Sequence, residues 1–269
     1  MIDTPRPHWE LGAGDSAVAY IVFSLAFLVA LAYMIRTARA ERTIWPLCLM
    51  AGAGLAVVYE PLNNVLALCT YPDGQPVFFR ALGRDIPLYI GLVYFVYWSA
   101  PVLWIMHRIR AGLSTAQWWR LYAVITVAVT CFEFLPLQRG WWNYYGAHQP
   151  LEILRFPMWW WVVNSQAIFG LAVLLHHLRR RVFTSNLTAP LVIPTMPLLL
   201  LFVHGGPAIP VFLAVGSTID QRTINLAGLA SMALGLGGMW VYGRLAVHPE
   251  PRGTPSGTPE RTSTHTPTG

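Results

Sequence analysis

Long apolar stretches alternate with short polar segments from about residue 16 to residue 247. Seven of these stretches approach the roughly 20 residues that a membrane-spanning helix needs. They lie at about 16 to 35, 44 to 68, 86 to 107, 117 to 137, 157 to 177, 189 to 214 and 223 to 246. The pattern therefore predicts an all-α membrane domain of seven transmembrane helices over residues 16–247.

The segments on either side of this domain contain little that could be buried. Residues 1–15 predict a short tail, and we expect Asp15 or Ser16 to cap the first helix. Residues 248–269 consist mostly of Pro, Thr, Gly and polar residues, a composition that predicts a disordered tail.

Composition agrees with a protein whose surroundings are a lipid bilayer. Apolar residues make up 55% of the chain, charged residues 11%, and the mean hydropathy is +0.48. All 18 basic residues are Arg, so the lysine Schiff base of a retinal protein is excluded. The three scattered cysteines (Cys48, Cys69 and Cys131) indicate neither a disulfide framework nor a thiolate metal site.

The arginines are distributed unevenly between the two sets of loops, and basic residues in short loops are retained in the cytoplasm. One set holds Arg36, Arg39, Arg42, Arg108, Arg110, Arg120, Arg179, Arg180, Arg181 and Arg244. The opposite loops contain fewer arginines, mixed with acidic residues. The bias predicts an external N-terminus and a cytoplasmic C-terminus, in the plasma membrane of a bacterium. The arginines flank spans and do not form a basic face, so we expect no nucleic-acid partner.

Several polar residues interrupt the predicted spans, where an unpaired polar group costs a few kcal/mol. The predicted orientation places all of them in the extracytoplasmic half of the bundle. Glu60, Asn63 and Asn64 lie in the second span, Glu133 in the fourth, Asn164 in the fifth and His204 in the sixth. We therefore expect Glu60 and Glu133 to lie close together, and one of them to be a catalytic acid. Two carboxyl groups in a poorly solvated pocket cannot both ionise easily. The alternative is that both serve only in helix packing.

The segment from residue 132 to residue 166, which joins two apolar stretches through a loop, is unusually rich in aromatic residues. Such rings are typical of a membrane interface, but they would also suit the wall of a pocket for an apolar substrate or a developing cation. The predicted substrate-binding residues are Asn63, Asn64, Asp85, Tyr94, Trp98, Asn143, Tyr145, Trp160, Trp161, Asn164 and His204. For Asp85, a helix N-cap is the alternative role.

Motifs for cofactors are missing from the sequence. It has no P-loop, no Asp-rich diphosphate motif and no dinucleotide glycine fingerprint. His176 and His177 lack the companion histidines of a membrane di-iron site. We expect no metal and no cofactor.

Three short motifs resemble the AveC-like family, named for the membrane spirocyclase of avermectin biosynthesis. They are YEPLNN at 59 to 64, TYPDG with FFRALGRDIPLYIGLVYFVYW at 70 to 98, and YYGAHQPLEILRFPMWWWVVN at 144 to 164. The resemblance implies acid-assisted cyclisation of a dihydroxy-ketone polyketide, sometimes with dehydration. Such a cyclisation requires no cofactor, and the expected partner of the protein is a hydrophobic small-molecule substrate.

Two other functions fit the same residues. A membrane terpenoid cyclase, hydratase or isomerase would also need a buried acid and aromatic walls. A non-catalytic carrier or receptor for an apolar ligand is the third possibility, although a carrier should have polar residues through both membrane halves. The inner half offers little beyond Gln117, Thr126 and Asn225.

Small residues recur every four positions in the last span. Ala227, Ser231 and Gly235 predict a tightly packed helix interface, because small side chains let two backbones approach closely.

Overall fold

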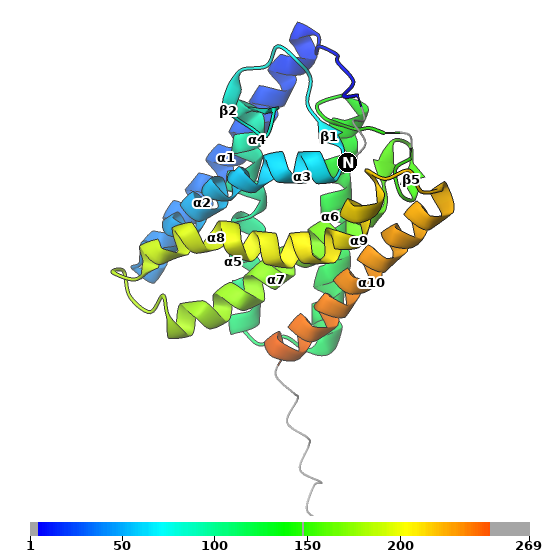
Figure 1. Ribbon diagram of the computed structural model, residues 1–269. Coiled ribbons are helices and arrows are strands. Elements are labelled where there is room, and N and C mark those ends of the chain that lie inside the picture. The colour runs from blue at the N-terminus through cyan, green and yellow to red at the C-terminus, as the bar shows by residue number, and fades with distance from the viewer. Residues whose placement is uncertain (1–4, 147, 248–269) are drawn as a thin grey trace, which may run out of the picture.

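A computed structural model describes residues 5–146 and 148–247. Across these residues, seven helical spans are long and apolar enough to cross a membrane. They are Ala13–Glu41, Trp45–Leu66, Leu88–Arg110, Thr115–Gln138, Trp159–Arg181, Ala189–Ala214 and Gln221–Ala246. The predicted all-α bundle of a multi-pass membrane protein is confirmed (Figure 1). The predicted disordered tail, 248–269, lies outside the described residues.

Four spans are single helices: α1 (Ala13–Glu41), α6 (Thr115–Gln138), α7 (Trp159–Arg181) and α10 (Gln221–Ala246). The other three spans are interrupted. The second contains α2 (Trp45–Leu55), a 3₁₀ turn (Ala56–Tyr59) and α3 (Glu60–Leu66), and the third contains α4 (Leu88–Tyr97) and α5 (Ala100–Arg110). The sixth contains a 3₁₀ turn (Ala189–Leu191), α8 (Val192–Leu200), a π-helical turn (Leu201–Gly205) and α9 (Gly206–Ala214).

The α7 helix forms the centre of the bundle. In its most apolar stretch 78% of the residues are buried, compared with 22% in α1. It packs against α5, α6 and α10. The outer helices carry large apolar side chains on their surface, such as Val29 of α1 and Leu213 of α9. This is expected where the surroundings are lipid.

The α7 and α10 helices approach closely through glycine. A Cβ atom at Gly235 would lie 2.8 Å from Cγ1 of Val162, and one at Gly170 would lie 2.8 Å from the ring of Tyr242. Ser231 and Gly235 are buried, as the sequence predicts for the interface of the last span. The prediction was wrong for Ala227, which is only half-buried. The buried stripe continues through Gly228 and Ile224 instead, because it follows the helical repeat of 3.6 residues.

Side-chain caps begin two of the long helices. Ser114 and Gln117 form a reciprocal capping box at α6, and the Asp220 carboxylate accepts the Arg222 and Thr223 backbone N–H groups at α10. The predicted cap of the first helix was wrong, since α1 begins after Gly12. Asp15 and Ser16 therefore lie inside the first turn, where Asp15 pairs with Arg139 (3.3 Å) and the Ser16 hydroxyl donates to Gln75 (2.8 Å).

Short antiparallel pairs of strands join the connections at one end of the bundle, which we call the hairpin end (Figure 1). Strand β1 (Cys69–Thr70) pairs with β4 (Asn143–Tyr144), β2 (Val77–Ala81) with β3 (Arg84–Pro87), and β5 (Glu152–Ile153) with β6 (Phe156–Pro157). The β1–β4 pair ties the connection after the second span to the connection after the fourth. We call the opposite end the arginine end, because α1, α5, α7 and α10 all finish there with arginines in or beside their last turns.

Candidate functional site

Proline interrupts three spans in the same way. Pro61, Pro101 and Pro207 each lie in the first turn of the helix that follows the interruption. Proline has no N–H group, so it leaves the carbonyl four residues earlier without its helical partner. For Pro207 this carbonyl belongs to Val203, and the side-chain amide of Gln166 on α7 donates to it over 2.5 Å. Non-helical turns at membrane depth are tolerated when the backbone is satisfied in this way.

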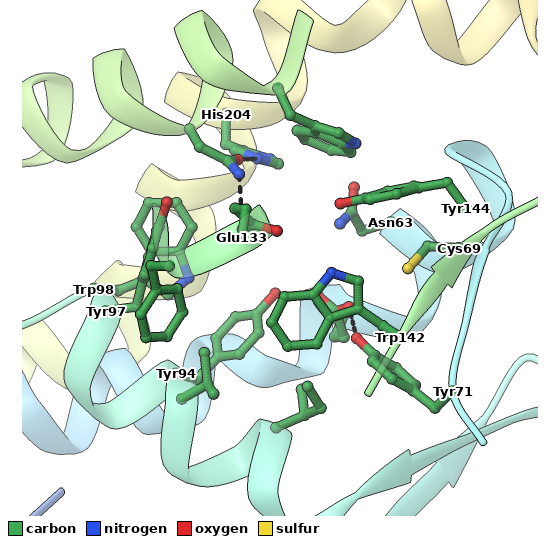
Figure 2. A pocket seen from close by; sticks show the side chains of 16 residues that line it. Asn63, Cys69, Tyr71, Tyr94, Tyr97, Trp98, Glu133, Trp142, Tyr144 and His204 are labelled. Carbon is green, nitrogen blue, oxygen red and sulfur yellow. Dashed lines mark hydrogen bonds between the residues drawn. The ribbon is translucent and has the colours of Figure 1, made fainter. Parts of the chain in front are cut away.

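The three interruptions meet at one cavity near the hairpin end. Glu60 follows the 3₁₀ turn of the second span, Trp98 lies between α4 and α5, and His204 lies in the π-helical turn of the sixth span. The cavity has a volume of about 80 Å³. Its lining is shown in Figure 2 and consists of Glu60, Asn63, Cys69, Tyr71, Ile90, Val93, Tyr94, Tyr97, Trp98, Phe132, Glu133, Trp142, Tyr144, Trp160, Asn164 and His204.

Glu60 is buried and accepts hydrogen bonds on both carboxyl oxygens. The Tyr71 hydroxyl donates to Oε1, and the Tyr94 hydroxyl donates to Oε2 over 2.5 Å. Tyr71 lies in the connection after the second span. Burial raises the pKa of its hydroxyl well above the usual range, and the negative charge of the nearby Glu60 raises it further. Tyr71 is therefore a neutral donor at physiological pH. The arrangement suits an ionised Glu60, since an ionised carboxylate only accepts hydrogen bonds.

Glu133 ends a chain of hydrogen bonds through three other spans. The Asn164 amide donates to its Oε1 over 3.0 Å, and Oδ1 of Asn164 lies 2.8 Å from Nε2 of His204. Nδ1 of His204 lies 3.3 Å from the Tyr59 hydroxyl. An amide oxygen can only accept, so the Nε2 atom of His204 carries the proton and Nδ1 accepts from Tyr59. In Figure 2 Glu133 projects into the space between Asn63, Trp98 and Trp142.

Aromatic rings form much of the remaining wall. Trp160 stacks on His204 with ring centres 5.1 Å apart, and Tyr97 meets Trp98 edge to face at 4.6 Å. Three buried polar atoms of the described lining residues have no hydrogen-bond partner: the Tyr97 hydroxyl, the Trp160 indole N–H and Oδ1 of Asn63. Buried polar groups are normally paired, so these three atoms can bind a polar group of a ligand.

The structure brings most of the predicted site residues together. Those that line the cavity are Glu60, Asn63, Tyr94, Trp98, Glu133, Trp160, Asn164 and His204. Tyr71, Tyr97, Trp142, Tyr144 and Cys69 also line it, although the sequence analysis did not select them. The β1–β4 pairing brings Cys69 and Tyr144 to the cavity, and a two-residue strand pair has almost no sequence signal. Burial raises the pKa of the Cys69 thiol well above its usual value, which keeps it protonated.

Five predicted residues do not line the cavity. Asp85 lies on β3, where its exposed carboxylate pairs with Arg80; the Arg80 hydrogen bond lowers the pKa of Asp85. It does not cap a helix either, because α4 begins at Leu88 after Pro87. Asn64 is fully buried one position beyond Asn63 on α3.

Of the other three, Asn143 and Tyr145 lie between the fourth and fifth spans, and Trp161 lies in the first turn of the fifth. Asn143 accepts from Arg155 (3.3 Å), and Arg84 donates to the Tyr145 hydroxyl (2.7 Å). Trp161 follows Trp160 on α7 and is therefore rotated by about 100° from the face that carries Trp160 and Asn164.

Within the described residues, no group of three or more His, Cys, Asp or Glu side chains could hold a metal ion. Comparisons of the chain with protein-family models, curated proteins and solved structures give no match.

Proposed function

We propose that the cavity is the active site of a membrane-embedded enzyme that cyclises an oxygen-bearing apolar molecule by acid catalysis, with loss of water. A spirocyclase acting on a polyketide is the form of this reaction that the AveC-like motifs favour. The observation that carries the proposal is the pair of carboxyl groups, Glu60 and Glu133, which come from different spans and line one small cavity in unequal hydrogen-bond environments.

The hydrogen bonds assign different roles to the two carboxyl groups. Two tyrosine hydroxyls donate to Glu60, which suits a carboxylate that balances positive charge in the cavity. Glu133 accepts only from Asn164 among the described residues, so its second oxygen, Oε2, can hold a proton. An apolar wall and limited hydration favour one charged and one neutral group in such a pair. Glu133 is then the proton donor.

The reaction follows from these roles. The Glu133 carboxyl protonates the hydroxyl of a hemiketal, the C–O bond breaks, and water leaves. The resulting oxocarbenium ion lies between aromatic faces and the Glu60 carboxylate, and ring faces stabilise a cation by about 0.5 to 2 kcal/mol. A second hydroxyl of the same substrate attacks the cationic carbon and loses its proton to the Glu133 carboxylate, which restores the acid. The products are a cyclic ketal and one water molecule.

The size of the cavity limits what it can hold. A volume of about 80 Å³ accommodates the reacting carbon and its oxygens but not a whole polyketide. The remainder of the substrate would therefore extend away from the cavity. The unpaired Tyr97 hydroxyl and Trp160 N–H are donors for a ketone or ether oxygen, and Oδ1 of Asn63 is an acceptor for a hydroxyl.

Asn164 and His204 act as positioning residues. The chain from Tyr59 through His204 to Asn164 fixes the direction of each hydrogen bond, so the Asn164 amide always presents a donor to Oε1 of Glu133. This leaves Oε2 as the oxygen of Glu133 that holds the proton.

The test uses membranes that contain Glu133→Gln or Glu60→Gln, incubated with dihydroxy-ketone substrates and analysed for cyclic products. Loss of a general acid should reduce kcat about 100-fold or more in Glu133→Gln. Glu152→Gln is the matched control, because Glu152 is exposed on β5 and does not line the cavity. Full turnover in both cavity variants would refute the proposal. Tight binding of the substrate without any product would instead indicate a carrier or receptor.

A further inference from the structure

A second recess lies at the arginine end of the bundle, at the opposite end from the cavity with Glu60 and Glu133. Its volume is about 380 Å³, and its lining consists of Ile109, Arg110, His176, Arg179 and Arg180. These residues come from the last two turns of α5 and α7, which pack against each other. The recess is therefore formed by two adjacent spans at the level where a helix leaves the membrane.

Neighbouring groups hold two of the guanidinium groups in place. Arg110 donates to Glu41 over 2.9 Å. Arg179 donates to the Phe183 carbonyl (2.5 Å) and to the Thr43 hydroxyl (3.3 Å), and it lies over the ring of Trp45. The partners of Arg179 are neutral, so they orient the cation without balancing its charge.

Positive charge exceeds negative charge at this recess. Glu41 is the carboxylate that pairs with Arg110, and it is shared with His107 at 3.0 Å. Arg179 and Arg180 make no ion pair within the described part of the chain. Several cations around one recess repel each other, and an anion bound between them relieves that repulsion.

We propose that this recess binds a phosphate group, supplied by the head group of an anionic membrane lipid. Guanidinium groups match phosphate oxygens through paired N–H donors. Basic pockets between transmembrane helices at the cytoplasmic face are a known setting for acidic lipid head groups. The site does not depend on the function proposed for the cavity.

The experiment compares two neighbouring arginines with the same change of charge. Both side chains are exposed, but only Arg180 lines the recess. The full-length wild type, Arg180→Gln, Arg181→Gln and Arg180→Lys are placed in nanodiscs of phosphatidylcholine, with or without phosphatidylglycerol. The melting temperature and the phosphatidylglycerol retained in native mass spectrometry are measured. In a third arm, inorganic phosphate is added to the neutral nanodiscs, with chloride at equal ionic strength as its control.

We expect phosphatidylglycerol to raise the melting temperature of the wild type and of Arg181→Gln. Arg180→Gln should bind the lipid about tenfold more weakly, the loss expected for one hydrogen bond to a charged group, and Arg180→Lys should bind with intermediate affinity. A different outcome is that inorganic phosphate alone raises the melting temperatures of wild type and Arg181→Gln as much as phosphatidylglycerol does, but not that of Arg180→Gln. That result would uphold the phosphate site and overturn the lipid as its source. Equal responses of Arg180→Gln and Arg181→Gln in all arms would overturn the site itself.

Discussion

Replacing Gly235 by Leu should separate α7 from α10, because this glycine lies at a close contact between the two helices. Even the Cβ atom of the new side chain would lie 2.8 Å from Cγ1 of Val162 and 3.2 Å from Cγ of Gln166. Non-bonded carbon atoms prefer about 3.5 to 4.0 Å, so the first contact is too short by roughly 0.7 Å or more. Val162 cannot easily rotate away, since a β-branched side chain in a helix has one strongly preferred rotamer.

The expected cost comes from two opposing terms. Removing a glycine from a helix interior stabilises the helix by about 1 kcal/mol. Overpacking a close interface destabilises by about 1 to 3 kcal/mol, and a leucine adds three more carbon atoms beyond the Cβ atom, so the upper end of this range applies. The variant should therefore be less stable than the wild type by about 1 to 2 kcal/mol.

Gly237→Leu provides the matched control. Gly237 lies two residues further along α10, and a Cβ atom there would meet nothing within 4 Å. Both variants gain the same helix propensity, so the difference between their melting temperatures reports the cost of overpacking the α7–α10 interface. For a protein of this size 1 kcal/mol corresponds to about 2 to 4 °C, which thermal unfolding followed by tryptophan fluorescence in one detergent can resolve. Equal melting temperatures for the two variants would show that this face of α10 does not form a close contact.

Two further predictions concern the ends of the bundle. In a background that lacks the exposed Cys131, a hydrophilic thiol reagent added outside intact cells should label Val77→Cys at the hairpin end but not Thr184→Cys at the arginine end; the reverse result would invert the predicted orientation. The Arg80 hydrogen bond lowers the pKa of Asp85 below its usual 3.8. The Arg80–Asp85 pair therefore stabilises the fold above pH 3.8, and this stabilisation is lost as the pH falls through the lowered pKa. Wild type should therefore lose more stability than Asp85→Asn as the pH falls below the usual 3.8 in melting experiments, and parallel curves would contradict the pairing.

The sequence predicted the seven spans because membrane helices are set by a local property, the length of an apolar stretch. The polar residues within the spans were also sound guides: Glu133, Asn164 and His204 come from three spans and form one chain of hydrogen bonds. An unpaired polar group inside a span is costly, so its presence marks a place where partners meet.

The remaining features depend on contacts between distant segments. Asp85 was predicted to face the site or to cap a helix, but Arg80 across the β2–β3 turn pairs with it on the surface. Tyr144 reaches the cavity through a pairing of two-residue strands, and Tyr71 through its hydrogen bond to Glu60. Neither contact follows from hydrophobic periodicity. The sequence shows the three prolines, but it does not show that the three interruptions meet at one cavity, because that depends on how the spans pack.

The proline interruptions also divide the bundle into two mechanical parts. A continuous helix resists bending because every turn is closed by hydrogen bonds, whereas a helix that begins again at Pro61, Pro101 or Pro207 lacks one bond at that point. Resistance to bending is therefore lowest where the short segments on the hairpin side, such as α3 and α9, begin, whereas on the arginine side α5 packs against α7 and α2 against α8. A guest molecule larger than the closed cavity could be admitted by bending at these points, and the membrane anchorage at the arginine end would be undisturbed.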